Sequence, residues 1–367
     1  MTRRSKTLRS ALALQRANLI EDSEVAPLNA VAKRYAVALT EDVIETINVN
    51  DPNDPIARQY LPSVAELQQS NNELVDPIGD EVHSPLPGLV HRYPDRVLLK
   101  PTLVCPVYCR FCFRREQVGH NASAPLSDAQ LDQIFDYVAA RPEIWEVIVS
   151  GGDPLALSSR RLAALIDRLK QIDHVRVLRF HSRVPVAAPS LINAELVAAL
   201  ASAKQATYVL VHANHANELN AAAKAACERL RRSGITLLSQ TVLLRQVNDS
   251  VAALSALMRA FVEAHIVPYY LHHPDLAPGS AHFRVSIERG QRLLKALRGQ
   301  YSGLCQPEYV IDIPGGDGKS PLTPSYLNQC ASNPSHYLIE DYQGEKHAYI
   351  DHADGQQQDA GSDPASS

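Results

Sequence analysis

The stretch VCPVYCRFCFRR, residues 104–115, carries three closely spaced cysteines, Cys105, Cys109 and Cys112. A structural zinc ion or a simple electron-transfer cluster normally takes four protein ligands. Only His120 offers a further ligand within the next dozen residues. Three thiolates on a four-iron cluster leave one iron open to a ligand that reacts. The spacing therefore predicts a 4Fe–4S cluster with a chemical role, in preference to three ordinary core cysteines.

On both sides of this stretch, the chain alternates between short β-rich runs and amphipathic helical patterns. The β-rich runs span residues 97–100, 146–150, 175–180, 207–212, 236–242 and 267–271. Helical patterns such as 158–171 and 217–232 separate them. Connections of this length between parallel strands form right-handed crossovers. The rhythm therefore predicts an α/β fold with a partial parallel (β/α)6 barrel.

Polar motifs follow nearly every β-rich run. They are the cysteine loop, SGGDP (150–154), HSR (181–183), HANH (212–215), Gln240 and HPD (273–275). The carboxyl ends of the strands of a β/α barrel meet at one mouth, where active sites lie. The motifs therefore predict a single site at that mouth.

The chain divides into four parts. Residues 1–84 are predicted to form a helical N-terminal extension, in which RYAVALTEDVIETI (34–47) is the clearest helix. Residues 85–300 form the barrel, and residues 301–345 form a C-terminal segment around a Gly-rich loop. Residues 346–367 are rich in Gly, Ser and Gln without an apolar period, so we expect them to be disordered.

The composition indicates a cytoplasmic enzyme that acts on small molecules. Beyond the cysteine loop, Cys227, Cys305 and Cys330 are scattered singly, which is no disulfide framework and is typical of a reducing compartment. The 36 basic and 40 acidic side chains give no global bias toward nucleic acid or a membrane surface. The apolar ALAL run near the N-terminus is too short for a signal peptide or a membrane span.

Taken together, the motifs resemble the radical S-adenosylmethionine (SAM) enzymes and, among them, the lysine 2,3-aminomutase family. The resemblance runs from about residue 51 to residue 326, in family order. Its motifs are NDPNDPIARQ, SPLPGLVHRYPDRVLL, CRFCFRR, VSGGDPL, VLLRQVND, VPYYLHHPDL and DIPGGDGKSPLTPSY. It implies a partial β/α barrel, a 4Fe–4S cluster, SAM, pyridoxal phosphate, and an electron donor such as flavodoxin or ferredoxin.

The resemblance assigns SAM to the open iron of the cluster and to the glycine motif. Gly151 and Gly152 would let the backbone approach the methionyl group, and Asp153 resembles the residue near the SAM ammonium. His212 and Gln240 match positions beside the nucleoside. A histidine at a strand end is, by itself, more often a satisfied core group.

Lys319 in DIPGGDGKSP is similar to the family lysine that binds pyridoxal phosphate. A lysine on a Gly-rich loop can form a Schiff base with an aldehyde cofactor. The rival interpretation, a phosphate-binding P-loop, fails because GxxxxGK requires Gly where this chain has Ile313. Arg92, Tyr93 and Arg96 match the family site for the phosphate, where guanidinium forks and a phenol suit a dianion.

The resemblance also implies a dibasic substrate. Arg114 matches the residue that binds the substrate α-carboxylate, for which a guanidinium is well shaped. Asp275 and Asp312 match a pair that holds the distal ammonium of lysine. Two carboxylates in one pocket repel each other unless a cation lies between them. Their joint presence favours a dibasic amino acid over glutamate, although either Asp alone is also a common turn or cap residue.

The implied reaction is a 1,2-amino migration that converts L-lysine to β-lysine. Three alternatives stay open: the branch that makes β-lysine for elongation factor P, which PYYLHHPDL resembles; a radical SAM enzyme of another amino acid; and one that uses no pyridoxal phosphate. The best-known aminomutases bind zinc through a Cys after VND and a C-terminal Cys cluster. Here Ser250 follows VND and no Cys lies beyond Cys330. We therefore expect no such zinc, and a homo-oligomer is left open.

Overall fold

The computed structural model of this chain describes residues 7–331 and 333–352. Its main feature is one nine-stranded sheet in which spatial order follows chain order, from β1 to β9. Seven neighbouring strands are parallel: β2 (Arg96–Thr102), β3 (Glu146–Gly151), β4 (Val177–Ser182), β5 (Ala206–His212), β6 (Thr236–Val242), β7 (Val267–His272) and β8 (Glu308–Asp312). Antiparallel strands β1 (Leu89–Tyr93) and β9 (Lys319–Pro321) form the two edges.

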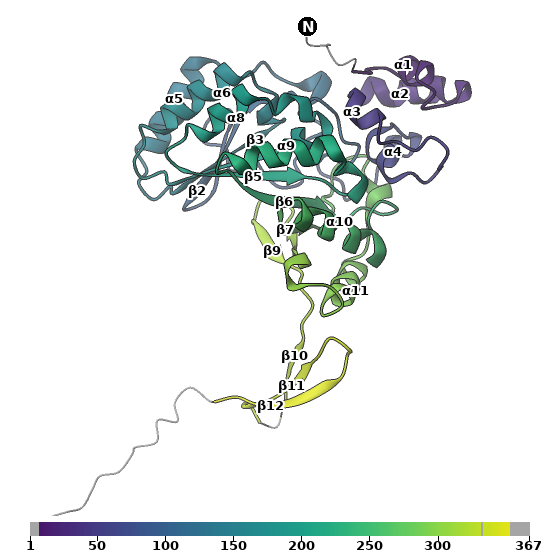
Figure 1. Cartoon of the computed structure of the whole chain (residues 1–367), viewed down its shortest axis with the longest axis vertical. Helices are drawn as coiled ribbons and strands as arrows, with labels where there is room; N and C mark the ends of the chain where they lie inside the picture. The colour runs from purple at the N-terminus through teal and green to yellow at the C-terminus, as the bar shows by residue number, and fades with distance from the viewer. Residues whose placement is uncertain (1–6, 332, 353–367) are drawn as a thin grey trace, which may run out of the picture.

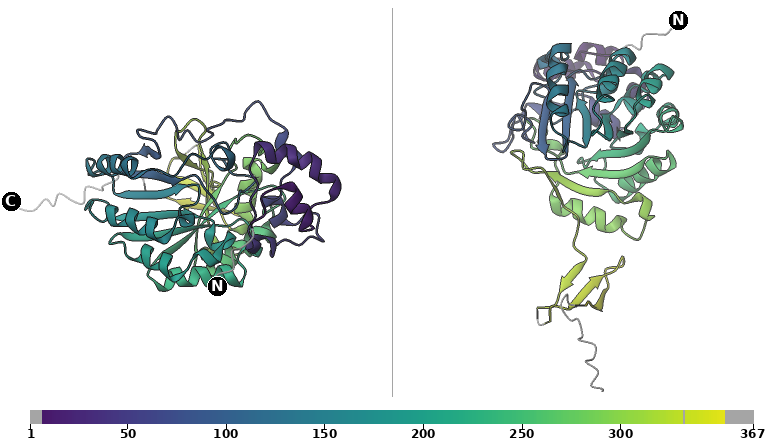
Figure 2. Two further views of the ribbon diagram at one scale, coloured as in Figure 1. Left: turned by 90° about the horizontal axis from the view of Figure 1, so that it is seen from above. Right: turned by 90° about the vertical axis from the view of Figure 1, so that its left-hand side faces the viewer.

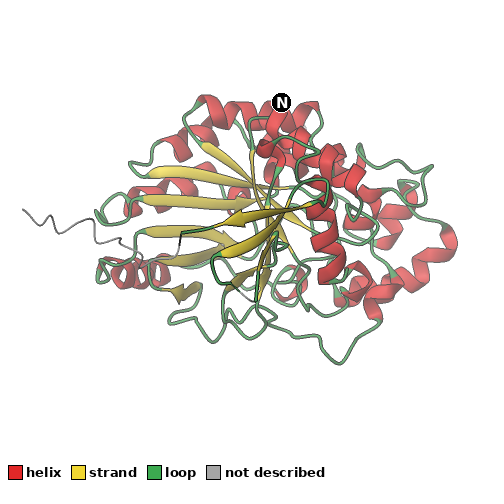
Figure 3. Ribbon diagram, turned by 90° about the horizontal axis from the view of Figure 1, so that it is seen from below, coloured by secondary structure: helices red, strands yellow, loops and turns green. Residues whose placement is uncertain are grey.

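The sheet curls without closing, since β1 and β9 are not paired with each other. Figure 3 shows the strands fanning out, with helices along their outer side. The predicted partial barrel is therefore confirmed, and each of the six predicted strands is present. The sheet is larger than predicted, because β8 and β9 from the C-terminal segment also join it. Residue 319 thus lies on an edge strand of the barrel itself.

The core lies between the sheet and the helices that connect its strands. These include α5 (Asp128–Ala139), α6 (Ser159–Leu169), α8 (Ala194–Ala201), α9 (Ala221–Arg232), α10 (Val251–Glu263) and α11 (Ile287–Leu297). Side chains alternate between the two faces of a strand. On β4, for example, Leu178 and Phe180 are fully buried against the helices, whereas Arg179 and His181 face the hollow of the curl. The concave face therefore carries charged and polar side chains among its apolar ones.

The N-terminal extension departs from its prediction at residues 34–47. Helix α2 (Val25–Arg34) ends where the predicted helix begins, and α3 (Glu41–Ile44) is only four residues long. Between them the chain is extended, and Leu39 exchanges backbone hydrogen bonds with Leu8. Thr40 interrupts the apolar pattern, because its hydroxyl caps α3 and donates to Ala187 O. The other helices here are α1 (Ala11–Arg16) and α4 (Pro55–Tyr60).

A small antiparallel sheet follows the barrel: β10 (Leu327–Gln329), β11 (His336–Glu340) and β12 (Lys346–Ile350). Figures 1 and 2 show it apart from the barrel. The prediction that disorder begins at residue 346 is wrong for residues 346–350, since the Asp341 carboxylate closes the β11–β12 turn by accepting from two backbone amides. Residues 353–367 lie outside the described residues. No helix in the described part is long and apolar enough to cross a membrane.

A buried carboxylate joins the extension to the cysteine loop. Glu66 has no solvent exposure, and Arg110 Nε donates to its two oxygens at 3.0 and 3.1 Å. Arg115 Nη2 also donates to Glu66, while its Nη1 reaches the carbonyl of Gly279 at 3.1 Å. Burial raises the pKa of Glu66, but Arg110 and Arg115 outweigh it and leave the pKa below its ordinary value. The charged form of Glu66 is therefore built into the fold.

We expect Glu66→Gln to lower the free energy of unfolding by about 3–5 kcal/mol, because it leaves two buried guanidinium groups without their counter-charge. Urea unfolding followed by circular dichroism measures the change. Glu228→Gln is the matched control, since Glu228 pairs with Arg231 and Arg232 on the surface and its loss should matter little. Equal shifts in the two variants would contradict the prediction.

Candidate active site

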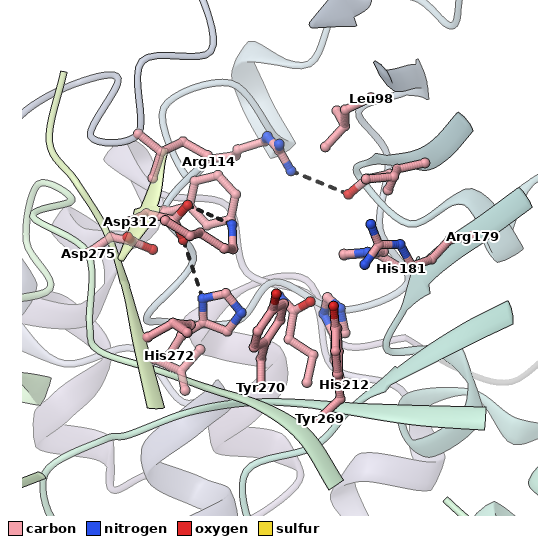
Figure 4. A pocket seen from close by; sticks show the side chains of 18 of the residues that line it. Leu98, Arg114, Arg179, His181, His212, Tyr269, Tyr270, His272, Asp275 and Asp312 are labelled. Carbon is pink, nitrogen blue, oxygen red and sulfur yellow. Dashed lines mark hydrogen bonds and ion pairs between the residues drawn. The ribbon is translucent and has the colours of Figure 1, made fainter. Parts of the chain in front are cut away.

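The hollow of the curled sheet is a cavity of about 690 Å³. That volume is in the usual range for small-molecule and cofactor sites. Inward-facing side chains from all of the parallel strands line it, and Figure 4 labels ten of the lining residues, including Arg114 and Asp275 from loops. It extends from the cysteine loop at the carboxyl ends of the strands down to Glu146 and Glu308 at their beginnings. The predicted location of the site at the barrel mouth agrees with this cavity.

The three cysteines lie in the loop between β2 and α5, and Cys109 and Cys112 line the cavity. Burial raises the pKa of each thiol, and it raises the pKa of Cys109 to about 12. The charge of Asp153, and a charge on Cys112 or Cys109, raises the pKa of Cys105 further. Among the described residues, no three His, Cys, Asp or Glu side chains close around one metal ion. The three thiols lie close enough to raise one another's pKa, and three grouped thiols suit a cluster in which each thiolate binds its own iron.

The glycine motif lies directly beneath the cysteine loop. Gly151 has φ +104°, and a Cβ there would lie 2.6 Å from the carbonyl oxygen of Thr102. A Cβ on Gly152 would lie 2.4 Å from the carbonyl oxygen of Val104. Neither glycine lines the cavity. The close approach that they permit in this structure is to the chain's own backbone.

Asp153 is held in place by hydrogen bonds at the end of β3. Its carboxylate accepts from Ser182 Oγ at 2.7 Å, from the Arg183 amide at 2.7 Å and from the Leu155 amide at 3.0 Å. The residue is buried and does not line the cavity. Its oxygens therefore fasten the end of β3 to the end of β4, and its charge raises the pKa of the Cys105 thiol. Its contact with a SAM ammonium stays a prediction.

His212 and Gln240 lie side by side on β5 and β6 and face the cavity, as predicted. Burial lowers the pKa of His212 to about 3, with a further contribution from the charge of Arg183. His181, on β4, contacts His212 edge to face, with ring centroids 5.6 Å apart. The Nε2 atoms of both rings are buried and have no partner. The sequence marked His181 only as part of a polar motif, although strand alternation places it inward with Arg179.

Arg92, Tyr93 and Arg96 all line the cavity near its edge. Arg92 Nη2 donates to the carbonyl of Ile78 at 2.6 Å, and the Arg96 guanidinium stacks 4.0 Å from the centre of the Tyr93 ring. The Tyr93 hydroxyl accepts from the backbone amide of Lys319 at 2.8 Å. The predicted phosphate residues and the predicted cofactor lysine are thus brought together from opposite edges of the sheet.

Asp80 is a buried residue of this site that sequence reasoning missed. Arg114 Nε and Nη2 donate to its Oδ2 at 3.0 and 2.9 Å, and Lys100 Nζ lies 3.4 Å from the same oxygen. Arg92 pairs with its Oδ1 at 3.3 Å. Burial raises the pKa of Asp80, but these cations, led by Arg114, lower it to about 2. Arg114 Nη1 lies 3.4 Å from Ser150 Oγ across the cavity (Figure 4).

Lys319 and Asp312 form an ion pair, with Nζ 2.6 Å from Oδ1. On the other oxygen, Oδ2, His272 Nδ1 lies at 3.3 Å. Burial raises the pKa of Asp312, but the His272 hydrogen bond and the Lys319 charge hold it below its ordinary value. Asp275 lines the same corner, and burial together with the charge of Asp312 raises its pKa to about 7. The two predicted acidic residues therefore do share one pocket.

Comparisons with known proteins agree with this geometry. Residues 99–257 match the radical SAM superfamily, and residues 294–364 match the model described as lysine-2,3-aminomutase. An L-lysine 2,3-aminomutase of Acetoanaerobium sticklandii is 39% identical over 308 residues, which cover 84% of this chain and 73% of that protein. An L-lysine 2,3-aminomutase of Escherichia coli is 36% identical, over 83% of this chain and 88% of its own length. A glutamate 2,3-aminomutase of Clostridioides difficile is 33% identical, over 82% and 70%. The chain belongs to the lysine 2,3-aminomutase family of radical SAM enzymes.

Proposed function

We propose that this chain converts L-lysine to β-lysine by moving the α-amino group to the neighbouring carbon. One observation carries the choice of substrate: Asp312 already holds an alkylammonium group, that of Lys319, at 2.6 Å. The side chain of a free lysine ends in the same group. The corner formed by Asp312 and Asp275 therefore suits the distal end of the proposed substrate.

The charges of this corner separate lysine from glutamate. Asp275 has a pKa raised to about 7, which records how strongly burial and Asp312 oppose a second negative charge. A substrate cation relieves that repulsion, whereas a distal carboxylate would add a third anion. Although one relative is named for glutamate, the acidic pair favours a dibasic amino acid here.

The cavity residues fit the cofactors that the family implies. Cys105, Cys109 and Cys112 would hold the cluster, and His212 and Gln240 would contact SAM. The phosphate of pyridoxal phosphate would bind Arg92, Tyr93 and Arg96, and its aldehyde would attach to Lys319. When bound, the cluster with SAM supplies a carbon radical that removes a hydrogen atom, and pyridoxal phosphate supplies a π-system across which nitrogen migrates.

The chain's own residues would position the substrate at both ends. Asp80 holds two nitrogens of Arg114, so the third, Nη1, is left directed across the cavity toward Ser150. That nitrogen would bind the α-carboxylate, while Asp312 and Asp275 bind the distal ammonium. Holding both ends fixes the reacting carbons between them.

The partners and the compartment follow from the chemistry. A low-potential donor such as flavodoxin or ferredoxin would deliver the electron that the cluster needs. All six cysteines are unpaired thiols, which suits the reducing cytoplasm. A homo-oligomer is left open, and the structural zinc of the best-known aminomutases is not expected.

The reconstituted protein should form β-lysine when it is incubated anaerobically with SAM, pyridoxal phosphate, dithionite and lysine. Mass spectrometry of parallel reactions with arginine, ornithine and glutamate tests the substrate. Lys319→Ala should abolish the product, and Lys295→Ala should retain it, since Lys295 pairs with Glu340 away from the cavity. Deoxyadenosine without any β-amino acid would contradict the proposed function.

The efficiency kcat/KM for lysine should rise with pH through about 7, where Asp275 ionises. Below that pH the carboxyl group is neutral and attracts the distal ammonium less, whereas the ammonium itself stays charged up to about pH 10. Initial rates between about pH 6 and about pH 8 measure the profile. In Asp275→Asn this step should vanish and the efficiency should be low throughout. The same step in the Asn variant would show that another group causes it.

A further inference from the structure

Asp312 has two partners in this structure, one on each carboxylate oxygen. Lys319 Nζ lies on Oδ1 and His272 Nδ1 on Oδ2, and Figure 4 shows both contacts. The proposed function requires Asp312 to exchange the first partner, because Lys319 would carry the cofactor and the substrate ammonium would take its place. The second partner, His272, has no such task. It can therefore stay on the carboxylate while the cation on the other oxygen changes.

The strand fixes His272 in this position. It is the last residue of β7, paired in register with Val242 on one side and Val310 on the other, and it is 6% exposed. Its ring meets that of Tyr270 edge to face, with centroids 5.6 Å apart. The next residue, His273, points to the opposite face of the sheet, where its Nδ1 lies 2.7 Å from Tyr309 OH. Of the two adjacent histidines, only His272 reaches the cavity.

The carboxylate of Asp312 needs such a partner. The last torsion of an Asp side chain is broad, so the strand alone does not fix which way the oxygens point. Without Lys319, the carboxyl group of Asp275 still faces this corner, and when charged it repels Asp312. A hydrogen-bond donor on Oδ2 opposes rotation of the carboxylate about this torsion and keeps Oδ1 directed at the substrate ammonium.

The protonation of His272 suits this role. Burial lowers its pKa and the Lys319 charge lowers it further, although Asp312 acts in the opposite direction. A neutral ring that donates from Nδ1 leaves the full negative charge of Asp312 for a cation. Nε2 has no partner and is buried. The contact with Asp312 is therefore the one polar interaction that this ring has with a described side chain.

We propose that His272 is a positioning residue for the substrate ammonium: by donating from Nδ1 to Asp312 Oδ2, it keeps Oδ1 turned into the cavity. This inference rests on the proposed function and deepens it. It makes affinity for lysine depend on a donor at one particular atom of residue 272. Asn and Gln distinguish that atom, because the amide nitrogen of Asn can take the place of Nδ1 and that of Gln the place of Nε2.

The test compares His272→Asn with His272→Gln. Isothermal titration calorimetry gives the lysine dissociation constant of each protein with cluster and pyridoxal phosphate bound and SAM withheld, so that no turnover occurs. The visible absorbance of the bound cofactor confirms equal loading. In the Gln variant, the dissociation constant and KM should rise about tenfold or more, as for the loss of one hydrogen bond to a charged group, with kcat little changed. The Asn variant should stay close to the unchanged chain.

The outcomes separate this inference from the proposed function. If the unchanged chain binds lysine and Asp312→Asn does not, the substrate corner is confirmed. Equal lysine affinity in the Asn and Gln variants, whether retained or lost, would then overturn the role of His272 alone. If the unchanged chain binds no lysine, both the proposed function and the inference fail.

Discussion

The buried ion-pair cluster of Glu66, Arg110 and Arg115 is the constraint on which the site depends. The cysteine loop has no strand or helix of its own to hold it over the sheet, and its arginines instead bind a carboxylate of the N-terminal extension. A buried ion pair adds little net stability compared with apolar packing, but its directional hydrogen bonds define one geometry. Because Arg115 also donates to the carbonyl of Gly279, the same ion-pair cluster fixes the loop that carries Asp275. The positions of the cysteines and of the substrate corner are thus set together.

Charged side chains on the concave face of the sheet are paired in the same way as Glu66 and its arginines. Asp80 gathers three cations, Asp312 holds Lys319, and Arg179 pairs with Glu146 at 2.8 Å. Burying a lone charge is costly, so each is paired. The Nε2 atoms of His181 and His212 are buried and have no hydrogen-bond partner among the described residues. Both rings line the cavity, so a ligand bound there could complete their hydrogen bonding.

Much of the fold could be predicted because buried parallel strands are short β-rich runs with amphipathic helices between them. Residues 236–242 form β6 as predicted, and β4 starts two residues later than expected. The failures share a cause, which is that long-range contacts override the local pattern. Residues 34–47 have a helical period, but pairing with the N-terminus and a cap at Thr40 break it. Likewise β9, with only three residues, is too short to be recognised without its neighbour β8.

Site residues that belong to a sequence motif could be predicted, whereas residues that only the tertiary structure brings into the site were missed. Cys109, Cys112, Lys319 and the acidic pair stand in recognisable motifs and line one cavity, and their roles stay predictions. Asp80 belongs to no recognisable motif, because its role depends on three cations that come from separate segments of the chain. Asp153 lies in a motif, yet the backbone amides at the ends of the neighbouring strands use its oxygens.

The ion pair between Lys319 and Asp312 makes the chain its own competitor. A tethered ammonium has a far higher effective concentration at the carboxylate than free lysine in solution. Free lysine therefore competes poorly as long as Lys319 is unmodified. In the proposed function the cofactor takes the Lys319 amine, which would remove that internal ligand and open the acidic corner. The proposed order of assembly is then cofactor first and substrate second, and protein that lacks its cofactor would not sequester the amino acid.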